Sequence, residues 1–365
     1  MILGILKEEM HQRVALSPKI ASKLQELGIQ CCMEKSAGLS SSFADEDYTG
    51  VTFMDRADLL KNSDILLSIS PLDSTSWKEL KSGVVLISLF EPFQDSTIVQ
   101  KLEEKKLGAF SLDMIPRITL AQSMDVLSSM ASIAGYQAAI LSAQLLPRYF
   151  PMLMTAAGSI PPAKVLVLGA GVAGLQAIAT AKRLGAVVEA FDVRSAAKEE
   201  VESLGAKFVE VEGATDDASA GGYAVEQSEE YKKRQQAEVQ KRALASDVII
   251  TTAQLRGRPA PRLLLEETVR SMKSGSVIID MAASSGGNCA LSEDGKLVVV
   301  SGVQILGDSN LADRLAQDAS RLFANNVYQF LKSLIHQGAW AIKPDDPIVE
   351  GAWITKGLPI QSYLK

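Results

Sequence analysis

One stretch of this chain constrains its fold more than any other: residues 164–174 read Lys-Val-Leu-Val-Leu-Gly-Ala-Gly-Val-Ala-Gly. The apolar run at its start is typical of a buried strand, and a helical pattern follows the last glycine. Gly169 permits a tight turn, Gly171 lets the backbone approach a pyrophosphate, and Gly174 lets the helix pack closely on the strand. The order of strand, glycine loop and helix therefore predicts a Rossmann-type unit that holds a dinucleotide at the helix N-terminus.

An acidic residue closes the next predicted strand, Val187–Asp192. Asp192 lies 18 residues after Gly174, where its carboxylate is placed to accept hydrogen bonds from ribose hydroxyls and to repel a 2′-phosphate. This favours NAD over NADP. Arg194 weakens that preference, because a guanidinium near the ribose accommodates a 2′-phosphate. A Rossmann domain that has lost its ligand is the alternative, and the sequence leaves it open.

Strands and helices alternate on both sides of this unit, which predicts two successive α/β series. The β-branched runs predict strands at Ile2–Leu6, Ile29–Met33, Ile65–Ile69, Val84–Phe90, Lys164–Leu168, Val187–Asp192, Lys207–Val211, Val248–Thr252, Val277–Met281 and Leu297–Val300. Helical periodicity predicts helices at Pro18–Leu27, Arg56–Lys61, Ser96–Lys105, a long one ending near Leu146, Ala173–Leu184, Ala196–Leu204, Glu229–Ala245 and Asp313–His336. The predicted fold class is α/β: two Rossmann-like domains with parallel sheets flanked by helices, joined by long helices with a cleft between them.

The length of 365 residues is too great for a single compact core and suits two domains. We predict a first Rossmann-like domain of residues 1–126 with 328–365, and an NAD(H)-binding Rossmann domain of residues 127–327. The last long helix returns the chain to the first domain, because the segment after it is too small to form a core. That segment, Pro344–Lys365, is expected to be an extended connector because prolines and glycines punctuate it.

Charge and composition exclude several classes of function. The net charge of −6 argues against nucleic acid as a partner, because phosphate backbones need a basic face. The three cysteines, Cys31, Cys32 and Cys289, have the spacing of neither a disulfide framework nor a zinc site, so no metal is expected. The most apolar stretch, Met130–Leu146, is interrupted by polar residues and is expected to be a buried helix rather than a membrane span.

A polar cluster precedes that apolar stretch. Gln122, Asp125 and Ser128 recur every third residue, so a helix would present them on one side, with Arg117 upstream able to pair with Asp125. These four residues, the polar cluster, have side chains that suit the positioning of a polar ligand. A solvated helix face with a capping Asp or Ser explains the spacing equally well.

Histidines are nearly absent, which limits the chemistry. The chain has only His11 and His336, and each suits a surface or packing position better than a catalytic one. Oxidising an alcohol or amine to a carbonyl releases a proton, which generally demands a tuned histidine or lysine. Hydride transfer between two nicotinamide rings releases no proton at the reacting carbons and needs alignment and exclusion of water. The polar cluster suits the positioning of a second dinucleotide.

Several stretches resemble the NAD(H)-binding component, domain I, of proton-translocating nicotinamide nucleotide transhydrogenase. They span essentially the whole chain: IPRITLAQSMDVLSS, FPMLMTAAGSIPPAKVLVLGAGVAGLQAIATAKRLGA, VESLGAKF, AGGYAVE and GSVIIDMAASSGGNC. The N-terminal stretch KEEMHQRVALSP is also similar to alanine dehydrogenase, which shares the fold of that component.

The resemblance implies roles for individual residues. At the hydride-transfer site, the side chains that orient the nicotinamide of NAD(H) and meet incoming NADP(H) would be Arg117, Gln122, Asp125 and Ser128. The pyrophosphate and adenosine ribose would be held by Gly169, Gly171, Val172, Gly174, Asp192, Val193 and Arg194. Tyr223 matches the tyrosine of a mobile loop that closes over the nucleotide. Without the resemblance, Val172 is interpreted as packing, Tyr223 as an exposed aromatic, and Asn288 as a structural residue of its loop.

Missing groups separate the chain from alanine dehydrogenase. That family holds its substrate carboxylate with an arginine and a lysine and uses a histidine for proton transfer. Arg13 matches the arginine, but Ser68 and Ser70 stand where the lysine is expected, and Glu91 stands where the histidine is expected. An amino-acid dehydrogenase without these groups lacks its substrate clamp and its base.

The resemblance implies a Re/Si-specific, proton-translocating NAD(P)⁺ transhydrogenase in which NADH on this chain passes hydride to NADP⁺ on a partner. The implied partners are the NADP(H)-binding domain III, the membrane domain II and a second copy in a homodimer. The chain itself would be cytoplasmic and peripheral on a bacterial inner membrane, with no span of its own. It stops at Lys365, before any membrane helix, as a subunit of a split enzyme or as a fragment.

Two residues depart from the family pattern. Leu120 stands where a basic residue is common and Met130 where a glutamine is common, which bears on partner contacts more than on NAD binding. Two other functions stay open: an amino-acid dehydrogenase of the alanine dehydrogenase type, and a non-catalytic NAD-sensing interaction protein.

Overall fold

The computed structural model describes residues 1–211, 228–343 and 345–363. The chain divides into two compact parts, which we call unit 1 (Met1–Met130 with Ala312–Lys365) and unit 2 (Ala131–Leu311). The boundary predicted at residue 327 falls inside helix α9 (Ala316–Leu334), all of which the structure assigns to unit 1. Two hydrogen bonds tie this helix there: the Val14 N–H donates to Ser320 Oγ at 2.9 Å, and Asn326 Nδ2 donates to the Ser123 carbonyl at 2.8 Å.

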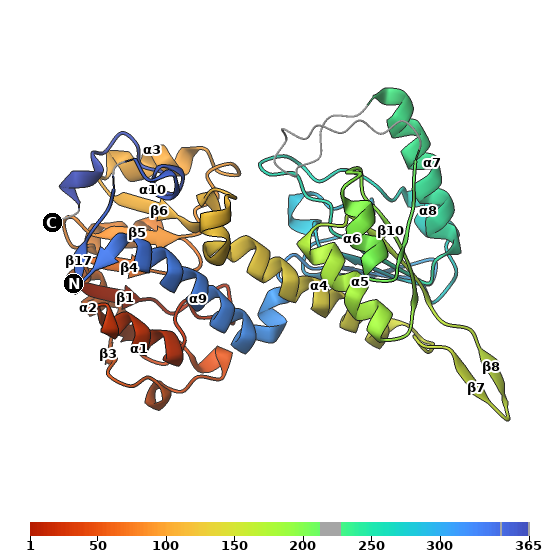
Figure 1. Ribbon diagram of the computed structural model, residues 1–365, viewed down its shortest axis with the longest axis horizontal. Coiled ribbons are helices and arrows are strands. Elements are labelled where there is room, and N and C mark those ends of the chain that lie inside the picture. Colours follow the sequence, from red (N-terminus) through yellow and green to blue (C-terminus); the bar gives the residue numbers. More distant parts are fainter. Residues whose placement is uncertain (212–227, 344, 364–365) are drawn as a thin grey trace. The chain divides into compact units, whose positions relative to one another are not determined.

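Unit 1 is built on a parallel sheet in the order β3-β2-β1-β4-β5-β6 (Figure 1). Its strands are β1 (Ile2–Ile5), β2 (Gln30–Glu34), β3 (Thr52–Met54), β4 (Ile65–Leu67), β5 (Val85–Ser88) and β6 (Gly108–Ser111), and its helices α1 (Pro18–Glu26), α2 (Arg56–Asn62), α3 (Thr97–Glu104), α9 and α10 (Pro347–Ala352). The chain order reverses between β1 and β4. The sequence did not predict β3 and β6, because three residues or a glycine-led run give little strand signal.

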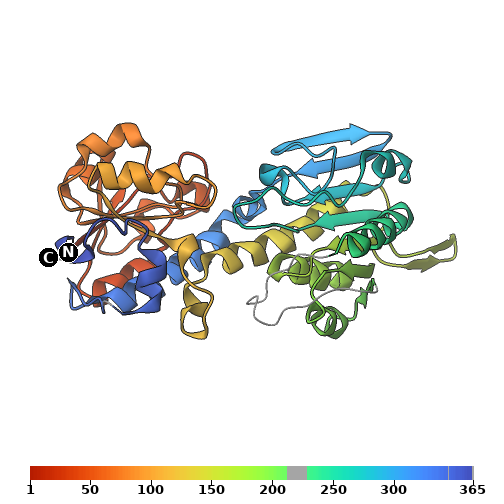
Figure 2. The ribbon, with the colours of Figure 1, turned by 90° about the horizontal axis from the view of Figure 1, so that it is seen from above.

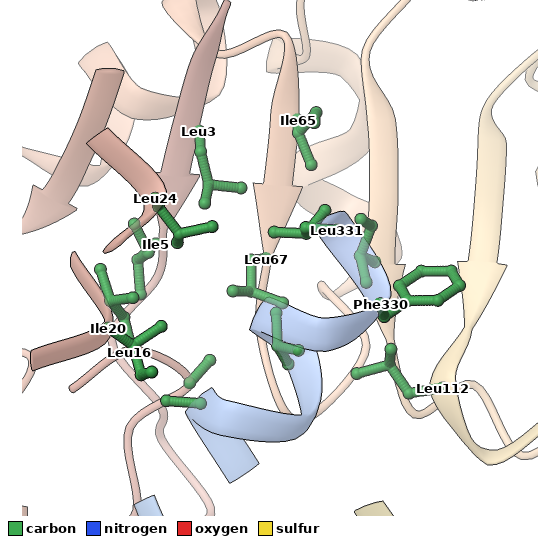
Figure 3. Packing of buried hydrophobic residues seen from close by; sticks show 14 of the residues in the cluster. Leu3, Ile5, Leu16, Ile20, Leu24, Ile65, Leu67, Leu112, Phe330 and Leu331 are labelled. Carbon is green, nitrogen blue, oxygen red and sulfur yellow. The ribbon is translucent and has the colours of Figure 1, made fainter. Parts of the chain in front are cut away.

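The core of unit 1 forms where α9 packs on the sheet. Phe330 and Leu331 on α9 are fully buried and belong to the same apolar cluster as Ile5 and Leu67 from the strands (Figure 3). The apolar periodicity that predicted this last long helix is therefore its core-facing stripe.

The end of the chain is not an extended connector, contrary to the prediction for Pro344–Lys365. Helix α10 forms there, and the indole of Trp353 packs edge-on against Phe110 with ring centroids 5.0 Å apart. The Ile354 N–H donates to the Ala109 carbonyl at 3.0 Å. The described residues of this segment pack on the apolar residues of β6, and the sequence of the segment alone does not contain that information.

Unit 2 carries a second sheet, in the order β11-β10-β9-β12-β13-β15-β14. Its strands are β9 (Lys164–Leu168), β10 (Val187–Phe191), β11 (Lys207–Phe208), β12 (Val248–Thr251), β13 (Val277–Asp280), β14 (Lys296–Val300) and β15 (Val303–Gly307). The helices are α4 (Val126–Leu145), which begins in unit 1, with α5 (Val172–Arg183), α6 (Ala197–Ser203), α7 (Glu229–Ala245) and α8 (Glu266–Ser271). All strands are parallel except β14, which pairs antiparallel with the unpredicted β15.

A short hairpin also went unpredicted. Strands β7 (Leu153–Thr155) and β8 (Gly158–Ile160) project from unit 2 as a two-stranded arm in both ribbon views (Figures 1 and 2). Met152 and Met154 are largely exposed on this arm. Because these apolar residues are exposed, the segment lacks the apolar pattern by which a buried strand is predicted.

Helix α4 is, within the described part of the chain, the one helix that is long and apolar enough to cross a membrane. Length and composition alone are weak evidence for a membrane span, because a helix in the core of a soluble protein can be equally long and apolar. Ala138 and Ala139 of α4 are fully buried in the core of unit 2, as the interpretation of this stretch as a buried helix requires.

Helix α4 crosses α5 at a glycine. A Cβ built on Gly135 would lie 2.0 Å from the carbonyl oxygen of Ala173, in the first turn of α5. Because any side chain would collide with backbone, Gly135 sets how closely α4 approaches the glycine loop.

We predict that Gly135→Ala lowers the free energy of unfolding by on the order of 1–3 kcal/mol, because the steric clash exceeds the gain of about 1 kcal/mol in helix propensity. Urea denaturation followed by circular dichroism measures the change. Gln144→Ala, at an exposed position of the same helix, is the control and is expected to stay within about 0.5 kcal/mol. An unchanged urea midpoint in Gly135→Ala would show that the helix crossing has room to spare.

Candidate functional site

Two of the three glycines in the loop between β9 and α5 make contacts that leave no room for a side chain. Gly169 has φ +101°, a left-handed conformation that favours glycine. A Cβ on Gly174 would lie 1.8 Å from the Gly169 carbonyl oxygen, so α5 begins in direct contact with the turn. The first and third glycines therefore have the turn and packing roles that the sequence predicted.

Gly171 differs from its neighbours in the loop. It is the N-cap residue of α5, and a Cβ built on it would meet no described atom within 4 Å. The space beside Gly171 is therefore open, where a bulkier residue would obstruct a ligand and not the protein. The first N–H groups of a helix have no partner within it and carry partial positive charge, so this space suits a pyrophosphate.

The loop lies at the point where the strand order of the sheet reverses, between β9 and β12. Thr252 directly follows β12, and its Oγ1 donates to the Gly169 carbonyl at 3.0 Å. Ligands of open α/β sheets bind at such a reversal, outside the carboxyl ends of the strands. The sequence analysis missed Thr252, although its place after a buried strand beside β9 was the available signal.

Asp192 directly follows β10, and its carboxylate is engaged on both oxygens. Oδ1 accepts hydrogen bonds from the backbone N–H and from Nε of Arg194, each at 2.9 Å. Oδ2 accepts from the Ala170 N–H at 2.7 Å and from Arg194 Nη2 at 2.9 Å. Asp192 thus bonds both to the glycine loop, through the Ala170 N–H, and to the guanidinium of Arg194.

Asp192 is ionised in this environment. Burial raises the pKa of its carboxyl, but the hydrogen bonds and charge of Arg194, together with the Ala170 N–H, outweigh burial and hold the pKa below its ordinary value. The folded-state pKa is depressed, so the contribution to stability is present above the ordinary pKa and is lost as the pH falls through the lower one. A full negative charge therefore stands beside the loop at neutral pH.

The other predicted nucleotide contacts have different surroundings. Val172 is 45% exposed, which does not fit the packing interpretation. Val193 is partly buried against the core beneath the sheet. Tyr223 lies outside the described residues. Asn288 is fully buried and bonds to the backbone of Ala253 with both its amide oxygen and its nitrogen, the structural role that the sequence favoured.

The polar cluster lies in unit 1, at the junction of two helices. Gln122 belongs to a 3₁₀ helix (Thr119–Met124), whereas Ser128 is in the first turn of α4, so one helix does not present both. Asp125 stands between them and accepts from the Ser128 N–H at 2.8 Å and from Ser128 Oγ at 2.6 Å. Asp125 is thus the N-cap of α4.

The remaining members of the cluster face solvent. Arg117 Nε lies 4.0 Å from Asp125 Oδ2, with the arginine side chain 50% exposed, so the expected pair exists and contributes little to stability. Gln122 is exposed. Asn326 of α9, which the sequence analysis missed, holds this segment through the Ser123 carbonyl. A polar residue on an otherwise apolar helix face was the signal for it.

Unit 1 has its own strand reversal, between β1 and β4, but no glycine loop there. The Glu8 carboxylate accepts the N–H groups of Ile69 at 2.5 Å and Ser70 at 3.1 Å, beyond the end of β4. Burial raises the pKa of Glu8, and these N–H groups and His11 only partly oppose it. The backbone N–H groups that follow β4 are thus already bonded to a carboxylate of the chain and are not available to a phosphate.

Arg13 is committed to a contact within unit 1. Its Nε donates to Asp313, and its Nη2 lies 3.1 Å from His11 Nδ1, which in turn lies 2.8 Å from Asp313 Oδ2. The Arg13 side chain is 6% exposed. Glu91, at the position expected of a histidine, is exposed and has φ +48°. The Arg13 guanidinium, which would bind a substrate carboxylate in alanine dehydrogenase, is here bonded to the Asp313 carboxylate.

Comparison with known proteins covers both units. Residues 4–134 match the family model described as alanine dehydrogenase/PNT, N-terminal domain, and residues 138–361 match alanine dehydrogenase/PNT, C-terminal domain. The chain is 45% identical over 370 residues to the first part of the NAD(P) transhydrogenase alpha subunit of Rhodospirillum rubrum, covering 98% of this chain and 96% of that protein.

Two further comparisons bracket the similarity. The crystal structure of transhydrogenase from Sinorhizobium meliloti superimposes with a TM-score of 0.88 at 43% identity, covering 97% of this chain and 98% of that one. An alanine dehydrogenase of Staphylococcus saprophyticus is 29% identical over 296 residues, which is 79% of this chain and 73% of that protein. The similarity to transhydrogenases is therefore higher in identity and longer in coverage.

We predict that Gly171→Ala leaves the free energy of unfolding within about 0.5 kcal/mol, because the new methyl group has room in the protein. It should weaken NADH binding at least about tenfold, because the methyl group occupies the space through which the backbone approaches the pyrophosphate. Fluorescence titration with NADH and urea denaturation measure the two effects. Gly174→Ala, which collides with the Gly169 carbonyl, should lose both stability and binding. Parent-like NADH affinity in Gly171→Ala would contradict the assignment of this space.

Proposed function

This chain belongs to the alanine dehydrogenase/PNT family, and we propose that it is the NAD(H)-binding subunit of an NAD(P) transhydrogenase. The observation that carries the proposal is the open space beside Gly171 at the N-terminus of α5, next to the ionised Asp192. The similarity to transhydrogenase subunits over nearly the full chain supports the same conclusion.

NAD(H) is the nucleotide that this chain holds. The glycine-loop residues Gly169, Gly171, Val172 and Gly174 surround the pyrophosphate, whose charge is stabilised by the helix N-terminus. The adenosine ribose lies against the segment that follows β10, formed by Asp192, Val193 and Arg194.

The proposed reaction is direct hydride transfer from NADH on this chain to NADP⁺ on a partner domain. The nicotinamide supplies the hydride, which leaves one ring carbon with its electron pair and joins the equivalent carbon of the second ring, so no proton is taken up or released at either carbon. The polar cluster aligns the two rings. Asp125 contributes by fixing Ser128 through two hydrogen bonds, so that this portion of the cluster is rigid before the nucleotide arrives.

The alternative function of an amino-acid dehydrogenase lacks support in unit 1. The Arg13 guanidinium is paired with Asp313 and buried, and Glu8 fills the strand reversal. Serines at Ser68 and Ser70 offer no cation for a substrate carboxylate. Without a free cation, the carboxylate of an amino acid has no partner at these described positions.

Partners complete the proposed enzyme. An NADP(H)-binding component receives the hydride, and a membrane component couples the transfer to proton translocation. This chain acts as a homodimer, peripheral on the cytoplasmic face of a bacterial inner membrane. Two exposed side chains suit contact with the NADP(H)-binding component: Gln122 of the polar cluster and its near neighbour Leu120.

We predict that Gln122→Asn and Asp125→Asn each reduce hydride transfer at least about tenfold, or about 1.4 kcal/mol in the barrier, because alignment of the two rings is lost. NADH affinity should stay within about threefold, because the glycine loop is untouched. The assay mixes the purified chain with the NADP(H)-binding component and follows NADH-dependent reduction of an NADP⁺ analogue. Gln144→Asn, the same change at an exposed position of α4, is the control for both variants.

Assays of the chain with and without the NADP(H)-binding component separate the alternative functions. NADH binding with no transfer rate in the presence of the partner would indicate an NAD-sensing interaction protein. Steady oxidation of NADH by pyruvate and ammonia in the isolated chain would indicate an amino-acid dehydrogenase. Transfer at the parental rate in both variants would remove the polar cluster from the reaction.

A further inference from the structure

The ion pair between Asp192 and Arg194 bears on which nucleotide the site accepts. The Asp192 carboxylate receives four N–H groups: the backbone of Ala170, the backbone of Arg194, and Nε and Nη2 of the Arg194 guanidinium, all at 2.7–2.9 Å. All four of these N–H groups come from the chain itself, and two of them belong to the Arg194 side chain. The side chains of Asp192 and Arg194 are 9% and 28% exposed, so water screens the pair only weakly.

Other charges lie around this pair. Glu200, on α6, adds to the field that keeps the Arg194 guanidinium protonated. Lys198, a second basic side chain of this segment, pairs with Glu210. The two basic side chains, Arg194 and Lys198, are thus each paired with an acidic residue of the same chain.

The chemistry of the ribose decides what these groups do. The 2′-hydroxyl of NAD(H) can donate a hydrogen bond to a carboxylate, whereas the 2′-phosphate of NADP(H) cannot and is repelled by it. A guanidinium binds phosphate through two parallel hydrogen bonds from its fork, which is why an arginine after the second strand accommodates NADP. In this chain the Nε–Nη2 fork of Arg194 is bonded to Asp192, and that carboxylate offsets the charge of the guanidinium.

We propose that Arg194 is a latent 2′-phosphate ligand of this nucleotide site and that its ion pair with Asp192, rather than the acidic charge alone, sets the preference for NAD(H) over NADP(H). The inference rests on the proposed nucleotide site and names its specificity determinant. Asp192 acts twice: it repels the phosphate and withholds a side chain that is positioned to bind it.

This arrangement matters for a reaction between two nucleotides. NADH and NADP⁺ differ only at the 2′ position of the adenosine ribose and in the redox state of the nicotinamide. A site that took both would bind the acceptor nucleotide where the donor belongs and block hydride transfer. Selectivity at the ribose is therefore essential to the reaction, although Asp192 and Arg194 contact no reacting atom.

The test is a set of single and double substitutions in the purified chain, titrated by calorimetry with NADH, NADPH and 2′,5′-ADP. Asp192→Ser frees the fork, so binding of NADPH and 2′,5′-ADP should strengthen at least about tenfold over the parent while NADH binding weakens. Asp192→Ser with Arg194→Ala should lose that gain. Arg194→Ala alone should bind NADPH no better than the parent.

A charge control separates release of the fork from a change in the local field. Glu200→Gln removes a negative charge near Arg194 and leaves the fork on Asp192, so its NADPH affinity should match that of the parent. A gain in Glu200→Gln equal to that in Asp192→Ser would overturn the proposal, because charge alone would then explain selectivity. Persistence of the gain in the double variant would overturn it as well.

Folding and the proposed function are read out separately. Circular dichroism and the urea midpoint show whether Asp192→Ser, which loses its bond to Ala170, keeps the fold; Asp192→Asn, nearer in shape, is the second variant. A folded variant of either kind that binds NADPH no better than the parent overturns the proposal. NADH binding by the parent chain is measured in the same series, and its absence would contradict the nucleotide site itself.

Discussion

The contact between Gly174 and the carbonyl of Gly169 is the constraint on which the rest of the nucleotide site depends. It starts α5 directly against the turn after β9, so that the first N–H groups of the helix face the space beside Gly171. Three other elements are fitted to the same turn: Thr252 bonds to the Gly169 carbonyl, Asp192 bonds to the Ala170 N–H, and Gly135 of α4 touches the backbone of α5. Because the turn is held by close backbone contacts and by hydrogen bonds from two neighbouring segments, it has little freedom to adjust.

The two units share a topology and differ in what occupies the strand reversal. In unit 2 the reversal carries glycines and an open helix N-terminus. In unit 1 it carries the Glu8 carboxylate, bonded to the backbone after β4, and the buried Arg13–Asp313 pair. A fold of this class therefore does not by itself specify a ligand. The residues at the carboxyl ends of the strands make one sheet suitable for a dinucleotide, whereas in the other the backbone N–H groups after β4 already bind a carboxylate.

Much of the secondary structure could be predicted from local pattern. The long strands and helices around the glycine loop follow the prediction to within a residue or two, because buried β-branched runs and amphipathic periodicity are strong signals. Strands β3, β6 and β15, the β7–β8 hairpin and the ordered chain end around Trp353 were missed. Each is short or is stabilised mainly by residues distant in sequence, as Trp353 is by Phe110. The polar cluster was found from its spacing, but its division between a 3₁₀ helix and α4 was not, because Asp125 ends one helix and caps the next.

By itself, the sequence determined the glycine turn and the position of the acid after the next strand, from which the dinucleotide site was predicted. Backbone geometry requires the glycines, ribose chemistry favours the acid, and both requirements are local. The tertiary structure decided the state of the charged side chains around the site. Arg194 was visible in the sequence as a cation near the ribose, but only the fold shows its guanidinium bound to Asp192. In the sequence, Arg13 matched the arginine that binds a substrate carboxylate. Only the fold shows that it is paired with Asp313, 300 residues away along the chain. Pairing between charges depends on distances in space, which separation along the chain does not encode.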